Sequence, residues 1–81
     1  MESLTHSPYQ LGHVLRGFRK QLGLTQAQLG EKLGLPQKDI SKMENNPGVV
    51  RIEKLYLLLG ALELELVLRP RDTPTRSELD W

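Results

Sequence analysis

The stretch from Gln26 to Met43 constrains the fold more than any other part of this 81-residue chain. A minimal side chain stands at Gly30, and a second glycine follows four residues later at Gly34. Two helices that cross closely at a steep angle need a small residue where they touch, and the short turn between them needs a residue that tolerates positive φ. The spacing therefore predicts a helix-turn-helix, with Ile40 and Met43 on the inner side of its second helix.

The helix before this pair can be read from its end signals and its apolar spacing. Ser7 is a suitable cap, Pro8 suits the first turn, and Gly23 suits the stop. The predicted apolar face consists of Leu11, Leu15, Phe18 and Leu22. At the start of the next helix, Thr25 and Gln28 stand in the spacing of a capping box.

A fourth helix is predicted within residues 51–62, and it is unusually apolar. Its expected core stripe holds Ile52, Leu55, Leu59 and Leu62, whereas Leu57 and Leu58 fall outside the stripe. The helix therefore carries more apolar surface than one core face needs. Together the patterns predict an all-α helix-turn-helix domain with four main helices.

The segment LELELVLRP, residues 62–70, alternates apolar and polar residues as a half-buried β-strand does. No second segment like it occurs, and a strand cannot leave its backbone groups unpaired beside an apolar face. We therefore predict that two copies of the chain pair these strands antiparallel across a two-fold axis, above the excess apolar surface of the fourth helix. The predicted homodimer interface comprises Leu58, Leu62, Leu64, Leu66 and Leu68.

The outer face of the second helix of the pair carries side chains that match the chemistry of DNA bases. At 100° per residue these side chains fall within about 140° of one another, opposite the apolar side. Glutamine can bond adenine bidentately, lysine can donate to guanine, and serine can serve either base in the major groove. The predicted base-reading residues are Gln37, Lys38, Ser41 and Lys42. The alternative is an ordinary solvated helix face, but the helix-turn-helix spacing favours DNA reading.

The net charge of +1 is unevenly distributed along the chain. Residues 1–62 hold eight Lys and Arg against five Asp and Glu, a balance of +3, whereas residues 63–81 hold three against five, a balance of −2. The basic part suits a polyanion such as double-stranded operator DNA. The predicted phosphate contacts are Gln26, at a helix N-terminus, together with Arg16, Lys20 and Asn45. Simple solvation is the alternative for each cation.

Glu44 falls at about 340° on the same projection, between the reading face and the core, so it is predicted to point inward. Arg19 is the cation expected to pair with it. A buried ion pair of this kind fixes how helices pack, and removal of one partner leaves a costly lone charge. The predicted role of the pair is structural.

Composition disfavours several function classes. The chain has no cysteine, and its histidines, His6 and His13, lack clustered carboxylates, so no metal, cofactor or redox role is expected. No set of nucleophile and base and no phosphate-cradling loop indicates an enzyme. The N-terminus lacks a signal-peptide pattern, and the most apolar segment is too short to span a bilayer, which predicts a cytoplasmic protein.

The segment RKQLGLTQAQLGEKLGLPQKDISKMENN resembles the lambda-Cro and Xre-type helix-turn-helix family, including the inward Glu44 and the Gln26 that opens the second helix. More narrowly, MENNP, LGALELELVL and a polar tail that ends in LDW are similar to the HipB-type antitoxins. That resemblance implies a dimeric repressor of its own toxin-antitoxin operon, bound to palindromic operator DNA on the bacterial nucleoid, with a HipA-type kinase toxin as partner. Pro36 departs from the family, in which many relatives have a capping or DNA-contacting side chain there.

The expected organisation is a flexible N-terminus over residues 1–6, a DNA-binding and dimerisation domain over residues 7–69, and a flexible tail over residues 70–81. The tail carries the single tryptophan of the chain, Trp81. The resemblance implies that Leu79 and Trp81 are apolar anchors for the toxin, and the alternative is a ring that folds back on its own domain or stays in solvent. Two other function classes remain: a stand-alone Xre-type repressor without a toxin, and an interaction protein that no longer binds DNA.

Overall fold

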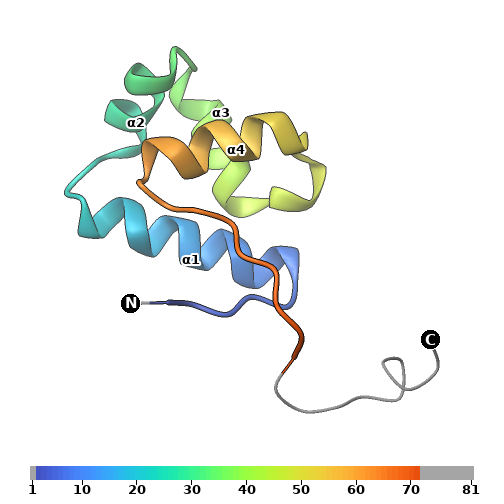
Figure 1. Cartoon of the computed structure of the whole chain (residues 1–81). Helices are drawn as coiled ribbons and strands as arrows, with labels where there is room; N and C mark the ends of the chain where they lie inside the picture. Colours follow the sequence, from blue (N-terminus) through green and yellow to red (C-terminus); the bar gives the residue numbers. More distant parts are fainter. Residues whose placement is uncertain (1, 72–81) are drawn as a thin grey trace.

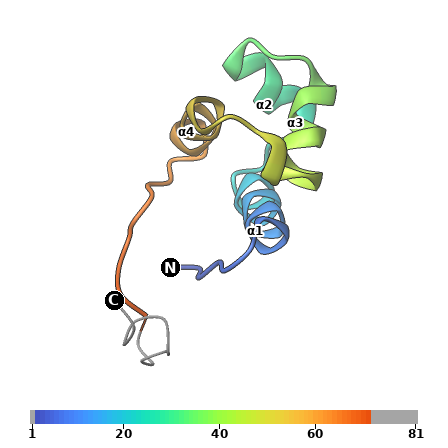
Figure 2. The same ribbon diagram turned by 90° about the vertical axis from the view of Figure 1, so that its right-hand side faces the viewer.

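The computed structural model describes residues 2–71 of the chain. Its elements are α1 (Pro8–Gln21), α2 (Gln26–Leu33), α3 (Gln37–Asn45), the 3-10 turn η1 (Pro47–Val49) and α4 (Ile52–Ala61) (Figure 1). The four predicted helices are confirmed, and no β-strand forms within these residues. In Figure 2, α4 stands on one side of the molecule and the α2–α3 pair on the other, with α1 below both.

The helix starts follow the predicted caps. The Ser7 hydroxyl accepts the Gln10 N–H at 3.1 Å at the start of α1. A reciprocal capping box opens α2, because the Thr25 hydroxyl accepts the Gln28 N–H at 3.0 Å and the Gln28 side chain accepts the Thr25 N–H at 2.9 Å. At the start of α3, Pro36 makes no side-chain cap bond. The absence of a cap hydroxyl at such a position typically costs about 1 kcal/mol.

Two glycines make the predicted turn between α2 and α3 possible. Gly34 ends α2 in the left-handed region, with φ 70°. A Cβ atom on Gly30 would lie 2.5 Å from the carbonyl oxygen of Leu35, which is too close for any side chain. A third close approach was not predicted: a Cβ atom on Gly12 of α1 would collide with the carbonyl oxygen of Glu44 at the end of α3. Backbone contact therefore sets the spacing of α1, α2 and α3.

The core lies between α1, the α2–α3 pair and α4, and it consists of Leu15, Leu29, Ile40, Met43, Leu58, Leu59 and Leu62. The predicted stripe of α4 is wrong at two positions, because Ile52 is 57% exposed whereas Leu58 is 1% exposed. The buried stripe is instead centred on residues 55, 58, 59 and 62, which follow the i, i+3, i+4, i+7 spacing. Ile52 is the first residue of the helix and lies to one side of this stripe. Leu22 is also exposed, because α1 ends before it.

The first two residues of the predicted strand, Leu62 and Glu63, belong instead to the end of α4. Leu62 is the C-cap of α4 and is buried in the core, so it is not part of an extended segment. Glu63 then adopts the left-handed conformation with φ 61°, and its N–H donates to the carbonyl of Gly60 at 3.1 Å. The N–H of Leu64 donates to the carbonyl of Leu59 at 2.8 Å, which completes a Schellman-type helix end.

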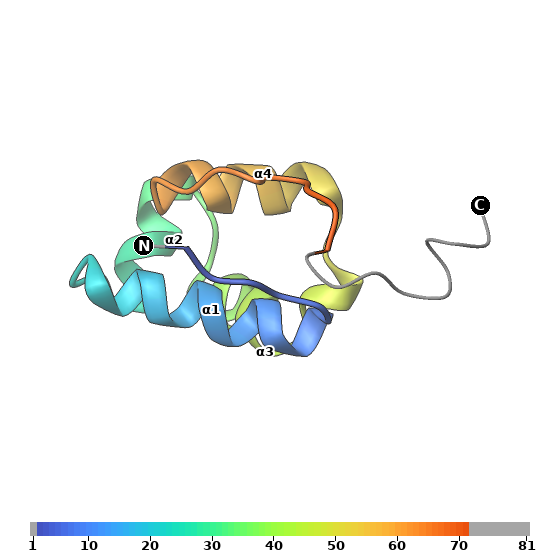
Figure 3. The same cartoon turned by 60° about the horizontal axis from the view of Figure 1, so that its bottom comes forward.

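The chain after this helix end runs without regular secondary structure over residues 64–71. Figure 3 shows it on the same side of the molecule as the N-terminal segment, residues 2–6. An exposed ion pair of 3.4 Å joins Arg69 to Glu2 across these two segments. Pairing of residues 64–70 with a second copy of the chain stays a prediction.

Candidate nucleic-acid interface

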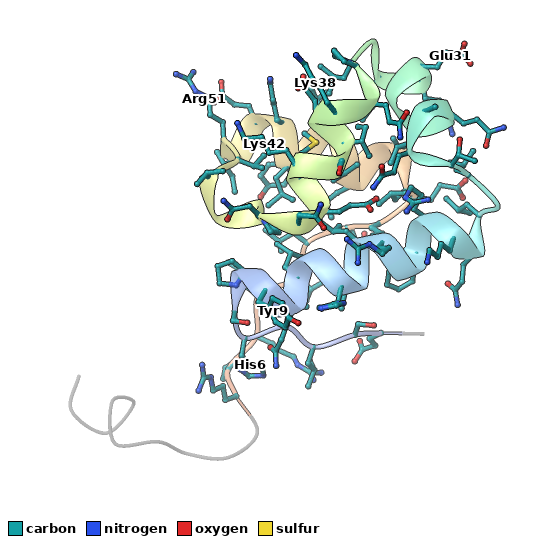
Figure 4. All side chains as sticks on the ribbon, turned by 180° about the vertical axis from the view of Figure 1, so that it is seen from behind. His6, Tyr9, Glu31, Lys38, Lys42 and Arg51 are labelled. Atoms are coloured by element: carbon teal, nitrogen blue, oxygen red, sulfur yellow. The ribbon has the colours of Figure 1, made fainter. Side chains whose placement is uncertain are left out.

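α3 presents one side to the core and the other to solvent. Ile40 and Met43 are buried on the inner side. Lys38 and Lys42 project outward from the helix (Figure 4), and Gln37 is exposed at its first position. Ser41 is partly buried. The structure therefore places the four predicted base-reading residues on the outer part of one helix.

The carboxylate of Glu44 lies directly behind this surface, with a side chain that is 1% exposed. Arg19 of α1 donates to it twice, from Nε to Oε2 at 2.6 Å and from Nη2 to Oε1 at 3.2 Å. The remaining Nη1 of Arg19 donates to the carbonyl oxygen of Leu24 at 2.8 Å. The structure thus brings together the two residues of the expected ion pair and ties them to the loop before α2.

Glu44 stays ionised despite its burial. Burial by itself raises the pKa of the Glu44 carboxyl, because a charged group is disfavoured away from water. The hydrogen bonds from Arg19 and Gln26, the positive charge of Arg19 and the hydrogen bond from Arg16 act in the opposite direction and together outweigh it. The pKa of Glu44 consequently lies below its ordinary value, and the carboxylate accepts hydrogen bonds at neutral pH.

Gln26 connects the buried carboxylate of Glu44 to Gln37 on the outer side of α3. Gln26, the first residue of α2, donates from Nε2 to Glu44 Oε1 at 3.1 Å. This bond fixes the orientation of the Gln26 amide, whose Oε1 accepts from Gln37 Nε2 at 3.4 Å. Gln37 keeps its own Oε1 and a second N–H free, which are the acceptor and donor that a bidentate contact to adenine requires.

The other end of α3 is tied to α1 in a similar way. Arg16 donates from Nε to Glu44 Oε1 at 3.4 Å and from Nη2 to Asn45 Oδ1 at 2.5 Å. Asn45 in turn donates from Nδ2 to the Ser41 hydroxyl at 3.2 Å. Glu44 thereby joins two short hydrogen-bonded chains, one to Gln37 and one to Ser41. We call the residues of both chains, together with Arg19, the Glu44 network: Arg16, Arg19, Gln26, Gln37, Ser41, Glu44 and Asn45.

The sequence did not reveal the links from Gln26 to Gln37 and from Arg16 to Asn45. A signal for the second link was present, because Gly12, Arg16 and Arg19 lie within about 60° of one another on a helical projection of α1. Glycine at such a position indicates where a neighbouring helix comes close, so the cations beside it can reach that helix. Lys20, the remaining predicted phosphate contact, is exposed in the last turn of α1.

The predicted dimer residues divide into two groups. Leu58 and Leu62 are buried in the core of the chain itself, so they have almost no surface to offer a partner. Leu64 is partly buried, whereas Leu66 and Leu68 are exposed, the latter by 89%. Further exposed apolar residues lie on η1 and α4, namely Val49, Ile52, Tyr56 and Leu57. The predicted tail anchors, Leu79 and Trp81, lie outside the described residues.

Residues 2–71 contain no group of three or more His, Cys, Asp and Glu side chains that could hold a metal ion. Over the same range, no helix has the length and apolar character needed to cross a membrane.

Comparison with known proteins places this geometry in a family. The family model described as helix-turn-helix matches residues 15–68. Two curated proteins named Antitoxin HipB, from two strains of Escherichia coli, are each 38% identical to the chain; they cover 94% of it, and the matches span 86% and 92% of their own lengths.

Solved structures of HipB complexes have the same fold. The HipB chain of a HipB–O1–O2 complex is 35% identical, with a TM-score of 0.79 over 85% of this chain and 100% of that one. One chain of a HipA–HipB–O2–O3 complex is also 35% identical, with a TM-score of 0.78 over 85% of this chain and 97% of that one. The chain therefore belongs to the helix-turn-helix family, in the group that contains the HipB antitoxins.

Proposed function

We propose that this protein is a sequence-specific DNA-binding repressor that acts as the antitoxin of a toxin-antitoxin operon. The observation that carries the proposal is the outer side of α3, where Gln37 and Ser41 are held by the Glu44 network and Lys38 and Lys42 are exposed beside them. A merely solvated helix face does not need a buried carboxylate with four donors behind it. Pre-oriented side chains suit recognition, because little conformational freedom remains to be lost when DNA binds.

In this proposal the residues have two kinds of role. Gln37, Lys38, Ser41 and Lys42 contact base edges in the major groove, where bidentate and donor contacts distinguish base pairs. Gln26, Arg16, Lys20 and Asn45 contact phosphates and fix the position of α3 on the duplex. The chain is then a binding protein rather than an enzyme, and it works without a cofactor.

The proposed repressor is a homodimer. Residues 64–70 expose Leu66 and Leu68 beside an open cavity of about 1210 Å³, whose walls include Leu11, Val14 and Phe18 of α1. A second copy that pairs its own segment with residues 64–70 satisfies the free backbone groups and covers these leucines. Two copies of α3 about 34 Å apart can then read successive major grooves of a palindrome.

A HipA-type kinase toxin is the proposed protein partner, and the complex represses its own operon in the bacterial cytoplasm. The support is the likeness to one chain of the HipA–HipB–O2–O3 complex, which spans 97% of that chain. Leu79 and Trp81 are proposed as apolar anchors for the toxin, because one tryptophan ring can bury about 200 Å² at an interface.

The test combines titration of DNA with capture of the toxin. Full-length protein is titrated into a labelled duplex from upstream of its own gene, and in parallel it is co-expressed with the neighbouring kinase-like open reading frame. We expect Gln37→Ala and Lys38→Ala to weaken operator binding by about 1 to 3 kcal/mol per lost bidentate contact. Non-specific binding should change little.

Lys32→Ala in the last turn of α2 serves as the matched control, since it removes a cation without touching α3. Equal operator affinity of the wild type and a Gln37 and Lys38 double variant would overturn the proposed reading face. Operator binding without any capture of the toxin would instead identify a stand-alone repressor.

A further inference from the structure

One side of α1 carries side chains that the proposed function uses only in part. On a projection at 100° per residue, Tyr9, His13, Arg16 and Lys20 fall within about 60° of one another. Arg16 and Lys20 belong to the proposed phosphate contacts, whereas Tyr9 and His13 have no role in the fold or in the Glu44 network. Tyr9 is 72% exposed and makes no contribution to the core.

These side chains border a crevice of about 230 Å³ between α1 and the end of α3, lined by Tyr9, His13, Arg16, Glu44 and Asn45. The rings of Tyr9 and His13 meet edge to face, with centroids 4.6 Å apart, so the two side chains act as one wall. Arg16 and Asn45 also line the crevice and are joined by a hydrogen bond of 2.5 Å from Arg16 Nη2 to Asn45 Oδ1.

The charge of the crevice suits an anion. The groups that face His13 and can carry charge are Tyr9 and Arg16 on its own helix and Glu44 on α3. Glu44 is buried and is bonded by both Arg16 and Arg19, so these three residues together leave one positive charge in excess. A protonated His13 adds a second positive charge. The Tyr9 hydroxyl and the Asn45 amide supply neutral donors.

We propose that the crevice formed by Tyr9, His13 and Arg16 holds a phosphate of the operator backbone next to the phosphate contacted by Asn45, and that protonation of His13 strengthens this contact. The inference rests on the proposed function, because it extends the DNA interface from α3 along α1. Histidine is the side chain that normally gains its charge between about pH 8 and pH 5, whereas a backbone phosphate stays anionic throughout this range. Operator affinity consequently depends on pH through one residue.

The test measures binding of the full-length protein to its operator duplex by fluorescence anisotropy at pH 7.5 and pH 6.0, at constant ionic strength. We expect the affinity of the wild type to rise about threefold to tenfold at the lower pH, and the dependence on salt to steepen by about 0.9 in logarithmic slope. In His13→Gln both changes should disappear. Tyr9→Phe should weaken binding about twofold to fivefold at both pH values while keeping the response to pH.

His6→Gln is the matched control, because it removes the other histidine of the chain. Figure 4 places His6 beyond the start of α1, below Tyr9, and it does not line the crevice. This variant should keep the pH response in full. A response that is equal in the wild type and His13→Gln, or that is lost in His6→Gln, would overturn the crevice while leaving operator recognition intact. Failure of the wild type to prefer the operator over a scrambled duplex would overturn the proposed function itself, and this inference with it.

Discussion

The α2–α3 pair and the segment after α4 differ in how far their polar groups are hydrogen-bonded and their apolar side chains buried. In the α2–α3 pair, helix caps and the Glu44 network form hydrogen bonds with the buried polar groups. Within residues 2–71, no buried side-chain nitrogen or oxygen lacks a hydrogen bond. In the second, residues 64–71 form no regular structure and expose Leu66 and Leu68. The polar groups of the first region are thus satisfied within one chain, whereas the second region leaves apolar surface that the proposed dimer would cover.

The largest effect is expected when the carboxylate of Glu44, at the centre of the network around the α2–α3 pair, is removed. Glu44→Ala leaves Arg19 buried without its anionic partner and frees the Gln26 amide, so we expect a loss of about 3 to 5 kcal/mol in the free energy of unfolding. Urea denaturation followed by circular dichroism measures this loss. Glu53→Ala, an exposed glutamate of α4, is the control and should change stability by less than about 0.5 kcal/mol.

The pH dependence of stability gives the same prediction a second readout. Because the pKa of Glu44 is lowered in the folded state, its stabilising effect is fully present above the pKa of the unfolded chain. This contribution is lost as the pH falls through the folded-state value. Wild type should therefore lose more stability than Glu44→Gln on acidification from pH 7. Parallel curves for the two proteins would show that the carboxylate charge does not stabilise the fold.

The next largest effect is expected at the turn. Gly30→Ala places a Cβ atom 2.5 Å from the carbonyl oxygen of Leu35, so the turn between α2 and α3 must shift. We expect a destabilisation of about 1 to 3 kcal/mol, typical of overpacking at a backbone contact. Gly17→Ala is the matched control in α1, where a Cβ atom meets nothing within 4 Å. It should stabilise the protein by up to about 1 kcal/mol, and a similar gain at Gly30 would mean that the close crossing is not required.

The open region is tested by Leu66→Pro, which removes a backbone donor and an exposed apolar side chain together. We expect at least about a tenfold rise in the dimer dissociation constant, or about 1.4 kcal/mol, with helix content unchanged. Sedimentation equilibrium measures the dimer, and operator binding should fall in parallel. Val67→Thr, on an exposed neighbour, keeps the N–H and serves as control. A wild-type protein that sediments as a monomer at micromolar concentration would contradict the proposed dimer.

The smallest expected effect lies at the boundary between the two regions. Glu63 is the one residue other than glycine with positive φ within residues 2–71. Glu63→Gly removes the steric cost of the left-handed conformation, and the helix end already has the hydrogen bonds of a Schellman motif. We expect the free energy of unfolding, measured by thermal denaturation, to rise by about 0.5 to 1 kcal/mol. Glu65→Gly, two residues later, should give no gain, and equal effects at both sites would show that α4 does not end as described.

The features that were predictable from the sequence are those encoded within a few residues. The caps at Ser7 and Thr25, the turn at Gly34 and the inner face of α3 follow from local spacing. The buried stripe of α4 was misassigned because the rotation of α4 about its axis depends on the path of the chain from η1 to Ile52. The spacing of residues within the helix does not reveal that path. The predicted strand wrongly included Leu62 and Glu63, because the alternation of residue type continues through them although the backbone there still closes the helix.

Most contacts of the candidate site join residues that are far apart in the sequence, which is why the sequence did not predict them. The Glu44 network joins residues 28, 25 and 18 positions apart through the bonds from Arg16, Arg19 and Gln26 to Glu44. The Arg19 bond was expected because opposite charges on inward faces suggest a partner. The two amide links depend on how the helices cross, and glutamine and asparagine give no charge signal in the sequence.

The Glu44 network also distinguishes the positions of α3 at which a substitution disturbs neighbouring side chains from those at which it does not. Gln37 and Asn45 are each hydrogen-bonded to a side chain on another helix, so a change at either one disturbs the orientation of its neighbours. Lys38 and Lys42 stand outside the network and project into solvent (Figure 4). Substitution at these two positions changes the exposed side chains of α3 without altering how α3 is held. In the proposed repressor, exchange of these two lysines is therefore expected to change the preferred operator while α3 stays held in the same way.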